Sequence, residues 1–302
     1  MALGTRKWPL SFPNGERVIA PRLYPPDTAY RLDWSGYSLQ SATGRIVMEL
    51  GLEGKRVLIT GASKGIGLGC AKAFAAEGCT VHLVARDGER LEQARDELVS
   101  AGASCTIHPV DLSAPGAVES LSGALPVPDI VVNNAGAIPG GDLQAIDEAA
   151  WREAWDLKVF GYINMTRAFY ALMKEKGGGV IFNVIGLAGV KLDPKYIAGT
   201  AGNASLNAFT KAMGSNALAD GMRVLGVNPG LVATDRLVTL LKTKAADEKG
   251  DADRWQDFLA GQPLGRAAKV EEIADVVTFL CSPRAGWATG IVVDLDGGQT
   301  YR

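Results

Sequence analysis

The stretch KRVLITGASKGIGLGCAKAFAAEG, residues 55–78, decides the fold class of this chain. It opens with a short apolar run that is typical of a strand buried on both faces. The turn TGASKGIG, residues 60–67, follows at once, and helical spacing then continues to Gly78. A glycine turn between a strand and a helix lets backbone N–H groups and the helix dipole receive a pyrophosphate. The stretch therefore predicts a dinucleotide-binding βα unit. The alternative is a turn of the same shape that holds no ligand.

Strand and helix patterns alternate from Gly51 to the end of the chain. Strands that alternate with helices pair in parallel through right-handed crossovers. We therefore predict an α/β fold, a single doubly wound Rossmann-type domain over residues 48–302, with helices on both faces of its sheet. Helical patterns cover residues 88–102 and the regions around 149–173 and 200–220. The further predicted strands are residues 80–86, 104–112, 128–136, 178–186, 222–230 and 290–298.

Residues 1–47 follow a different pattern. Five prolines stand there among scattered aromatic residues, and no helical or strand period is sustained. No basic start followed by an apolar stretch appears, so we expect no secretory signal. The segment is predicted to be an irregular N-terminal extension. An over-long assigned start is the alternative, because Met48 precedes the first regular element.

Composition excludes several classes of partner. The 31 basic and 33 acidic residues nearly balance, so we expect no nucleic-acid partner. No apolar run reaches the roughly 18 residues that span a bilayer, so we expect no membrane partner. Two histidines exclude a histidine-rich metal site, and no metal is predicted. The cysteines form no CxxC pair and are interpreted as buried thiols of a cytoplasmic protein; they are Cys70, Cys79, Cys105 and Cys281.

Four short motifs stand in order along the chain. They are the glycine spacing of Gly61, Gly65 and Gly67, the VDL segment with Asp111, NNAG at 133–136, and NPGLVAT at 228–234. Together they resemble the motifs of the classical short-chain dehydrogenase/reductase family, and the resemblance covers residues 51 to about 300. It implies a seven-stranded parallel sheet, a nicotinamide cofactor across the carboxyl ends of the strands, and a homodimer or homotetramer.

The resemblance also implies which residues hold the cofactor. The glycine turn would receive the pyrophosphate, Asp111 and Leu112 would flank the adenine, and the segment from Pro229 to Thr234 would close over the nicotinamide. The complete predicted set is Gly61, Ser63, Lys64, Gly65, Ile66, Gly67, Arg86, Asp111, Leu112, Asn134, Ala135, Gly136, Lys158, Pro229, Gly230, Val232 and Thr234.

The end of the second predicted strand bears on the choice of cofactor. A site that prefers NAD(H) carries a carboxylate there for the ribose 2′-hydroxyl. This chain has Ala85 at that position, followed by Arg86, and Lys64 adds a cation in the glycine turn. Arginine can meet a 2′-phosphate with a planar fork of donors. We therefore expect NADP(H) in preference to NAD(H). The alternative is that Arg86 is a solvated charge and Asp87 takes the ribose.

The family's Ser-Tyr-Lys-Asn tetrad is replaced at all four positions. By the resemblance, the tyrosine donates a proton, and a lysine four residues on lowers the tyrosine pKa. Aligned on NVIGLAG, Gly186 stands at the serine position, Gly199 at the tyrosine position and Asn203 at the lysine position. Lys158 stands where the preceding helix would carry the asparagine. The chain is thus predicted to be a divergent member.

The replacements suggest a rebuilt catalytic set. Lysine and asparagine look exchanged between neighbouring helices, so Lys158 is predicted to face the nicotinamide ribose and Asn203 to hold a water opposite. Tyr196 is predicted to supply the phenol, in the room left by the glycines. Alternatively, Lys158 is a surface lysine and Tyr196 a packing residue, while Gly199 and Gly202 allow close helix contact across a subunit interface. The loop charges Asp193 and Lys195 are expected to be solvated.

Residues 235–262 are predicted to form a helical substrate flap, because the resemblance implies one in this region. Its candidate apolar residues either favour a hydrophobic substrate or only pack the flap onto the domain; they are Leu237, Leu240, Leu241, Trp255 and Phe258.

Three functions remain open from the sequence. The first is an NADP(H)-dependent oxidoreductase that acts on a small carbonyl or alcohol substrate, with Lys158, Tyr196 and Asn203 as its catalytic set. The second is a nucleotide-binding sensor or scaffold without turnover. The third is a lyase or hydratase on the same fold, with Lys158 as the base.

Overall fold

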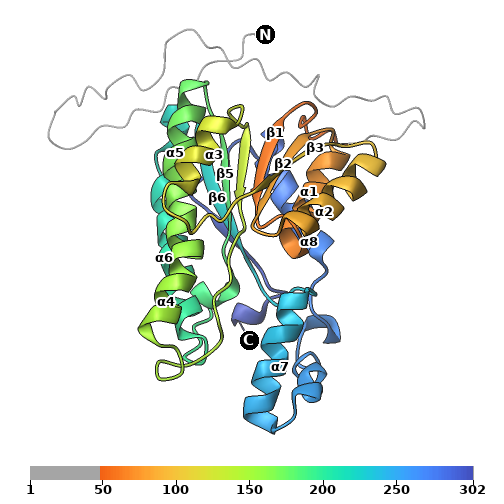
Figure 1. The fold of residues 1–302 in the computed structure, drawn as a ribbon, viewed down its shortest axis with the longest axis vertical. Helices are drawn as coiled ribbons and strands as arrows, with labels where there is room; N and C mark the ends of the chain where they lie inside the picture. The colour runs from red at the N-terminus through yellow and green to blue at the C-terminus, as the bar shows by residue number, and fades with distance from the viewer. Residues whose placement is uncertain (1–47, 302) are drawn as a thin grey trace, which may run out of the picture. The chain divides into compact units, whose positions relative to one another are not determined.

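The computed structural model describes residues 48–301, and the unit Leu50–Arg302 is compact (Figure 1). The predicted N-terminal extension, residues 1–47, lies outside the described residues. Seven strands form one sheet in the order β3-β2-β1-β4-β5-β6-β7, and every neighbouring pair is parallel. This confirms the predicted doubly wound, seven-stranded sheet. The strands are β1 Arg56–Thr60, β2 Thr80–Ala85, β3 Ser104–Pro109, β4 Ile130–Asn133, β5 Gly179–Val184, β6 Met222–Pro229 and β7 Val292–Leu295.

Helices cover both faces of the sheet, as Figure 1 shows. One face packs against α1, α2 and α8, while α3 and α5 cover the other. Alternation along β1 explains why both faces are apolar, because Val57 and Ile59 join the first core and Leu58 joins the second. The helices are α1 Gly65–Ala76, α2 Gly88–Ser100, α3 Ala117–Ala124, α4 Glu148–Trp155, α5 Gly161–Glu175, α6 Ile197–Gly214, α7 Asp235–Lys249 and α8 Val270–Cys281.

The region around 149–173, predicted as one helical stretch, is divided in the structure. Between α4 and α5 stands η2, Asp156–Phe160, a five-residue π-helical turn. Such turns are rare and occur often at functional sites, because the wider turn re-aims the side chains that it carries. Lys158 lies at the centre of this turn.

The strand order reverses beside β1, which pairs with β2 on one side and with β4 on the other. In open parallel sheets, ligands bind outside the carboxyl ends of the strands at such a switch point. The topology therefore places a binding crevice beside the glycine turn, which follows β1.

The predicted flap is helical. Its first element is α7, followed by η5, Ala252–Phe258. Leu237 and Leu241 pack with Ala267 in a small core of their own. Most of the flap's apolar surface is therefore used for packing. Among residues 48–301, no helix has the length and apolar character that a membrane span requires.

Arg223 on β6 holds the carboxyl end of α8. Its guanidinium is buried and donates to the carbonyl oxygens of residues 280, 281 and 282 at 2.7–3.0 Å, with longer bonds to residues 285 and 288. A cation at a helix carboxyl end satisfies orphaned carbonyls and complements the helix dipole. This contact ties α8 to β6, the neighbour of the edge strand β7.

Candidate functional site

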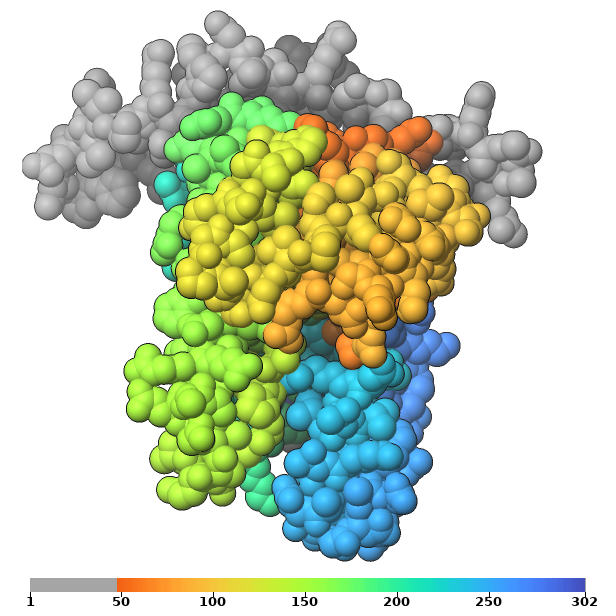
Figure 2. Space-filling view, viewed as in Figure 1, coloured from red at the N-terminus to blue at the C-terminus, as the bar shows by residue number. Residues whose placement is uncertain are grey.

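A cavity of about 800 Å³ lies at the carboxyl ends of the strands. Its walls include Asn134 and Gly136 after β4, Ile185 and Gly186 after β5, and residues 229–234 after β6. The flap and residues 140–145 line opposite sides, and Figure 2 shows a furrow between the flap and the α4 region. The cavity therefore lies where the topology predicts a ligand.

The glycine turn fits a dinucleotide. Gly61 has a φ of 64°, and a Cβ there would stand 2.9 Å from the Cα of Ala135. The turn therefore approaches the β4 segment so closely that only glycine fits. Directly after it, the backbone N–H groups of the first turn of α1 are free to receive phosphate oxygens.

Asn134 braces this turn from the neighbouring strand. Its Nδ2 donates to the carbonyl oxygens of Thr60 and Gly61 at 3.0 and 3.1 Å, while its backbone N–H donates to Thr60 Oγ1 at 2.9 Å. The predicted role was to line the cofactor. The hydrogen bonds show in addition that the Asn134 amide fixes the shape of the turn.

The other predicted cofactor residues fall into two groups. Ser63, Gly65 and Ile66 lie in or directly after the glycine turn, and Thr234 approaches Gly65 while its Oγ1 caps α7. Pro229 and Gly230 line the cavity beside Thr234. The second group is buried or packs against the core, which leaves the backbone for a ligand; its members are Gly67, Leu112, Ala135 and Val232.

The carboxyl end of β2 carries a cation and lacks a free carboxylate. Arg86 is exposed and approaches Asp111 at 3.9 Å, a weak surface pair. Asp87 caps α2 by accepting from Arg90 N–H, and it also forms an ion pair with Arg90 at 3.2 Å. Lys64 is exposed at the start of α1. The carboxylate proposed as an alternative ribose ligand is thus engaged elsewhere.

Lys158 lines the cavity, so the surface-lysine alternative is wrong. Its Nζ donates to the carbonyl oxygen of Ile185 at 2.6 Å, and its methylenes pack on Gly136. Burial, assisted by the positive charge of Arg236, lowers the pKa of Lys158 to about 7. Near neutral pH this amine therefore exists in both its charged and its neutral form.

Asn203 lies directly behind Gly186. A Cβ at Gly186 would stand 2.9 Å from Asn203 Nδ2, so the amide occupies space that a serine there would need. Asn203 is 3% exposed, and its Oδ1 has no hydrogen-bond partner within the described part of the chain. A buried acceptor left alone costs about 1–3 kcal/mol, so a water or a ligand donor is expected beside it.

Tyr196 immediately precedes α6, and its ring lies over Gly199. A Cβ at Gly199 would overlap the ring of Tyr196, which also lines the cavity. The ring packs beside Trp155 and Ile138 as well. Tyr196 therefore combines a packing contact with an approach to the cavity.

The subunit-interface alternative for the two glycines of α6 is wrong. Gly199 is covered by Tyr196, and a Cβ at Gly202 would stand 3.1 Å from Val159 and 3.2 Å from the indole nitrogen of Trp155. Both glycines are thus buried against their own chain. Of the two loop charges, Lys195 is exposed as expected and pairs with Glu248 at 2.7 Å, whereas Asp193 is only partly exposed; both line the cavity.

Sequence reasoning missed two polar residues of this region. Arg236, on the first turn of α7, lines the cavity and donates to the carbonyl oxygen of Ile138 at 2.6 Å. Asn207, one turn after Asn203, is 8% exposed and has both amide atoms unpartnered among the described residues. The signal for Arg236 was its place two residues after the NPGLVAT motif. Asn207 gave no comparable signal.

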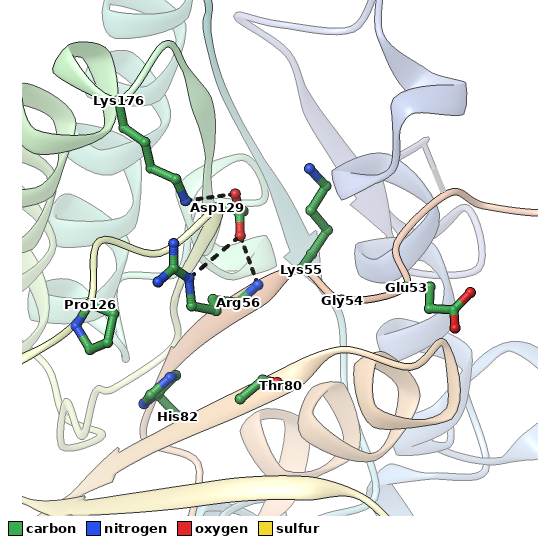
Figure 3. A pocket seen from close by; sticks show the side chains of 9 residues that line it. All are labelled: Glu53, Gly54, Lys55, Arg56, Thr80, His82, Pro126, Asp129 and Lys176. Atoms are coloured by element: carbon green, nitrogen blue, oxygen red, sulfur yellow. Dashed lines mark hydrogen bonds and ion pairs between the residues drawn. The ribbon is translucent and has the colours of Figure 1, made fainter.

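A second depression, of about 660 Å³, lies at the amino ends of the strands. Figure 3 shows Asp129 at its centre, bound by Lys176 and by the side chain and backbone N–H of Arg56. None of the predicted site residues lies there. Within residues 48–301, no group of three or more His, Cys, Asp or Glu side chains is arranged to hold a metal ion.

Comparisons with known proteins agree with this architecture. A family model described as enoyl-(acyl carrier protein) reductase matches residues 61–300. Galactitol 2-dehydrogenase (L-tagatose-forming) of Cereibacter sphaeroides is 32% identical over 252 residues, which cover 82% of this chain and 96% of that protein. The 7α-hydroxysteroid dehydrogenase of Escherichia coli K12 is 28% identical over 255 residues, which cover 82% of this chain and 95% of that enzyme.

Solved structures give the same result. L-sorbose reductase from Gluconobacter frateurii, complexed with NADPH and L-sorbose, has a TM-score of 0.77 at 30% identity and covers 84% of this chain and 100% of its own. A 7α-hydroxysteroid dehydrogenase complexed with NADH and 7-oxo glycochenodeoxycholic acid has a TM-score of 0.74 at 26% identity, with coverages of 83% and 96%.

Proposed function

Because this chain belongs to the classical short-chain dehydrogenase/reductase family, we propose that it is an NADP(H)-dependent oxidoreductase with a rebuilt catalytic set. The substrate would be a small carbonyl compound, reduced to an alcohol, or the alcohol in the reverse direction. One observation carries the proposal: an intact glycine cradle opens beside a cavity that contains both the Lys158 amine and the Tyr196 phenol.

The preference for NADP(H) rests on the end of β2. Lys64 and Arg86 are exposed cations near the position of an adenosine ribose, and Asp87 is committed to capping α2. Relatives with bound NADPH and with bound NADH are both known, so the choice between the two cofactors in this proposal rests on the local charge.

The chemistry divides between the cofactor and three side chains. When bound, the reduced nicotinamide supplies the hydride that reaches the carbonyl carbon. Tyr196 donates its phenol proton to the carbonyl oxygen, which completes the alcohol. Lys158 then returns a proton to the phenolate, since its pKa of about 7 lets it exchange protons near neutrality. Asn203 Oδ1, which lacks a partner, holds the water that reloads Lys158.

A second candidate is a nucleotide-binding protein without turnover. It is favoured by the position of Tyr196, because its ring lies over Gly199 and packs against an apolar cluster that contains Ile138, which suits a structural role. A third candidate, a lyase with Lys158 as base, is favoured by the lowered pKa of that amine.

The test is a panel of aldehydes and ketones incubated with NADPH, with absorbance at 340 nm as the measure of cofactor oxidation. Turnover that Lys158→Met and Tyr196→Phe each abolish, with NADPH binding retained, supports the oxidoreductase. Lys242→Met is the matched control, because Lys242 is an exposed residue of α7 that pairs with Asp253. Tight NADPH binding without oxidation favours the second candidate. Product formed without a change at 340 nm favours the third.

We further propose a homodimer or homotetramer in a reducing, cytoplasmic environment. The free thiols support the compartment, since all four cysteines are unpaired and burial raises the pKa of each thiol: Cys70, Cys79, Cys105 and Cys281. Light scattering on the eluting protein measures the oligomeric state directly.

A further inference from the structure

Arg236 presents a guanidinium to the cavity without a carboxylate partner. It lies on the first turn of α7 and is partly buried. Its one hydrogen bond within residues 48–301 runs from Nη2 to the carbonyl oxygen of Ile138, at 2.6 Å. A guanidinium has five N–H donors in a planar fork. Most of its donors are therefore available to a ligand.

A second cation, Lys158, lines the same cavity as this guanidinium and interacts with it electrostatically. The positive charge of Arg236 helps to lower the pKa of Lys158, and no acidic group of the described chain contributes to that shift. Lys158 and Arg236 thus line one cavity, and neither forms an ion pair within residues 48–301. Like charges so placed repel each other, and an anion between them would relieve the repulsion.

Three of the four carboxylates that line the cavity have partners other than Arg236 and Lys158, and the fourth is exposed. Glu248 pairs with Lys195, and Asp142 accepts two backbone N–H groups at 2.9 and 3.0 Å. Asp193 accepts the backbone N–H of Lys195 at 2.9 Å, and Asp247 is exposed. None of them forms an ion pair with Arg236 or Lys158. The Arg236 guanidinium and the Lys158 amine are therefore not neutralised by an ion pair with these four carboxylates.

Apolar side chains stand beside this charge. Leu240 of α7 reaches across to Gly140, where a Cβ would lie 3.7 Å from the leucine methyl. Leu237 and Ile138 complete an aliphatic wall next to Arg236. A ligand that matches this surface has an anionic end and a short aliphatic body.

We infer that Arg236 binds a carboxylate of the substrate, so that the enzyme acts on oxo acids and their hydroxy acids in preference to neutral ketones. This inference rests on the proposed function, because it takes the cavity as the substrate site. The planar fork of arginine matches a carboxylate with two parallel hydrogen bonds. Arg236 would anchor the acid group and leave the reacting carbonyl to Tyr196 and Lys158.

A phosphate of the cofactor is the other source of the same anionic chemistry. Thr234, two residues earlier, approaches the glycine turn, so a reach from Arg236 toward the pyrophosphate must be tested as well. The two sources differ in which affinity depends on Arg236: that of the substrate acid or that of NADPH.

The experiment compares 4-methyl-2-oxopentanoate with its methyl ester as substrates, for the wild type and Arg236→Met. A charge-assisted hydrogen bond contributes about 1.5–3 kcal/mol, which corresponds to roughly 10- to 100-fold in kcat/KM. We expect the wild-type kcat/KM for the acid to exceed that for the ester by this factor. Arg236→Met should lower kcat/KM for the acid and leave kcat/KM for the ester unchanged. Arg236→Lys should keep part of it, and Lys242→Met should keep all of it.

A binding measurement separates this inference from the proposed function. Calorimetry measures 4-methylpentanoate, a non-reacting acid, and 4-methylpentanamide on the protein with NADP⁺, and it measures NADPH on each variant. Acid binding that Arg236→Met abolishes supports the inference even if no carbonyl is turned over, in which case only the proposed function fails. Equal kcat/KM for acid and ester overturns the inference and leaves the function standing. It is equally overturned if the acid does not bind, or if Arg236→Met weakens NADPH binding tenfold or more.

Discussion

The ring of Tyr196 occupies the space that a side chain at Gly199 would need. The same relationship recurs one turn later, where the amide of Asn203 occupies the space of a side chain at Gly186. By the resemblance in the sequence, both glycines are predicted to stand at positions of reactive residues, and in both cases a polar side chain from a nearby position occupies the space beside the glycine. The proposed catalytic set would thus be rebuilt from neighbouring positions, with the space beside each glycine still filled.

Tyr196→Phe tests the first of these replacements. The substitution keeps the ring over Gly199 and removes only the hydroxyl. A positioned proton donor contributes about 10²- to 10⁴-fold, so we expect kcat to fall by that range with NADPH affinity unchanged. Gly199→Ala should lower kcat too, because its Cβ would displace the ring. Steady-state kinetics with the best carbonyl of the panel measures both. Full activity in Tyr196→Phe would exclude the phenol as donor.

The pH dependence of reduction tests Lys158. Burial holds the pKa of this amine at about 7, so it is charged below and neutral above that pH. Because the charged amine reloads the phenol, we expect kcat/KM for reduction to decline as pH rises through 7. Arg236→Gln removes a neighbouring positive charge, which raises the amine pKa and moves the decline to higher pH. An unchanged profile in Lys158→Met would contradict this assignment.

The same lysine predicts a gain of stability when it is removed. In the unfolded chain Lys158 titrates near 10.5 and in the fold near 7, so between these values the unfolded state binds the extra proton. Stability therefore rises with pH across that window, and the full penalty is present below pH 7. We expect Lys158→Met to melt at a higher temperature than the wild type at pH 6.5, with a smaller difference at pH 9.5. Lys242→Met supplies the control, since its exposed amine should show no pH-dependent difference.

Much of the fold could be predicted because it rests on local patterns. The glycine turn after β1 and the apolar strand runs are consequences of backbone geometry and of burial on both faces. The aligned spacing also brought Lys158, Tyr196 and Asn203 to one cavity. The sequence does not show which way a side chain points in the fold. That Asn134 braces the turn through its amide, or that η2 turns Lys158 inward, depends on tertiary contacts without a sequence period.

Arg236 is a residue of the site that the sequence does not distinguish from its charged neighbours. On sequence alone it was one of several charges in a flap with a solvated centre. Only the structure shows that it enters the cavity while Lys242, six residues later, pairs on the outside with Asp253. Helical spacing places residues on a face, but which face meets the cavity is decided by how the flap packs on Ala267.

Cofactor choice is tested at the end of β2. The double variant Lys64→Ala, Arg86→Ala should lose NADPH affinity far more than NADH affinity, because the two cations would meet the 2′-phosphate that only NADPH carries. Ala85→Asp should move the preference toward NADH by adding a carboxylate that accepts a hydrogen bond from the ribose 2′-hydroxyl. Fluorescence titration with both cofactors measures the ratio. Equal losses for the two cofactors in the double variant would contradict an NADP(H) preference.

Arg223 is predicted to stabilise the fold and to take no part in the site. Replacing it by methionine would leave several buried carbonyl oxygens at the end of α8 without a donor, at about 1–3 kcal/mol for each that water cannot reach. We expect Arg223→Met to lower the free energy of unfolding by at least about 3 kcal/mol in urea titrations, since three of these bonds are 3.0 Å or shorter. Arg223→Lys, which keeps the charge but has fewer donors, should fall between the methionine variant and the wild type. Because Arg223 lies far from the carboxyl-end cavity along β6, the folded fraction of either variant should keep its kcat. A loss of kcat without a loss of stability would place Arg223 in the catalytic machinery instead.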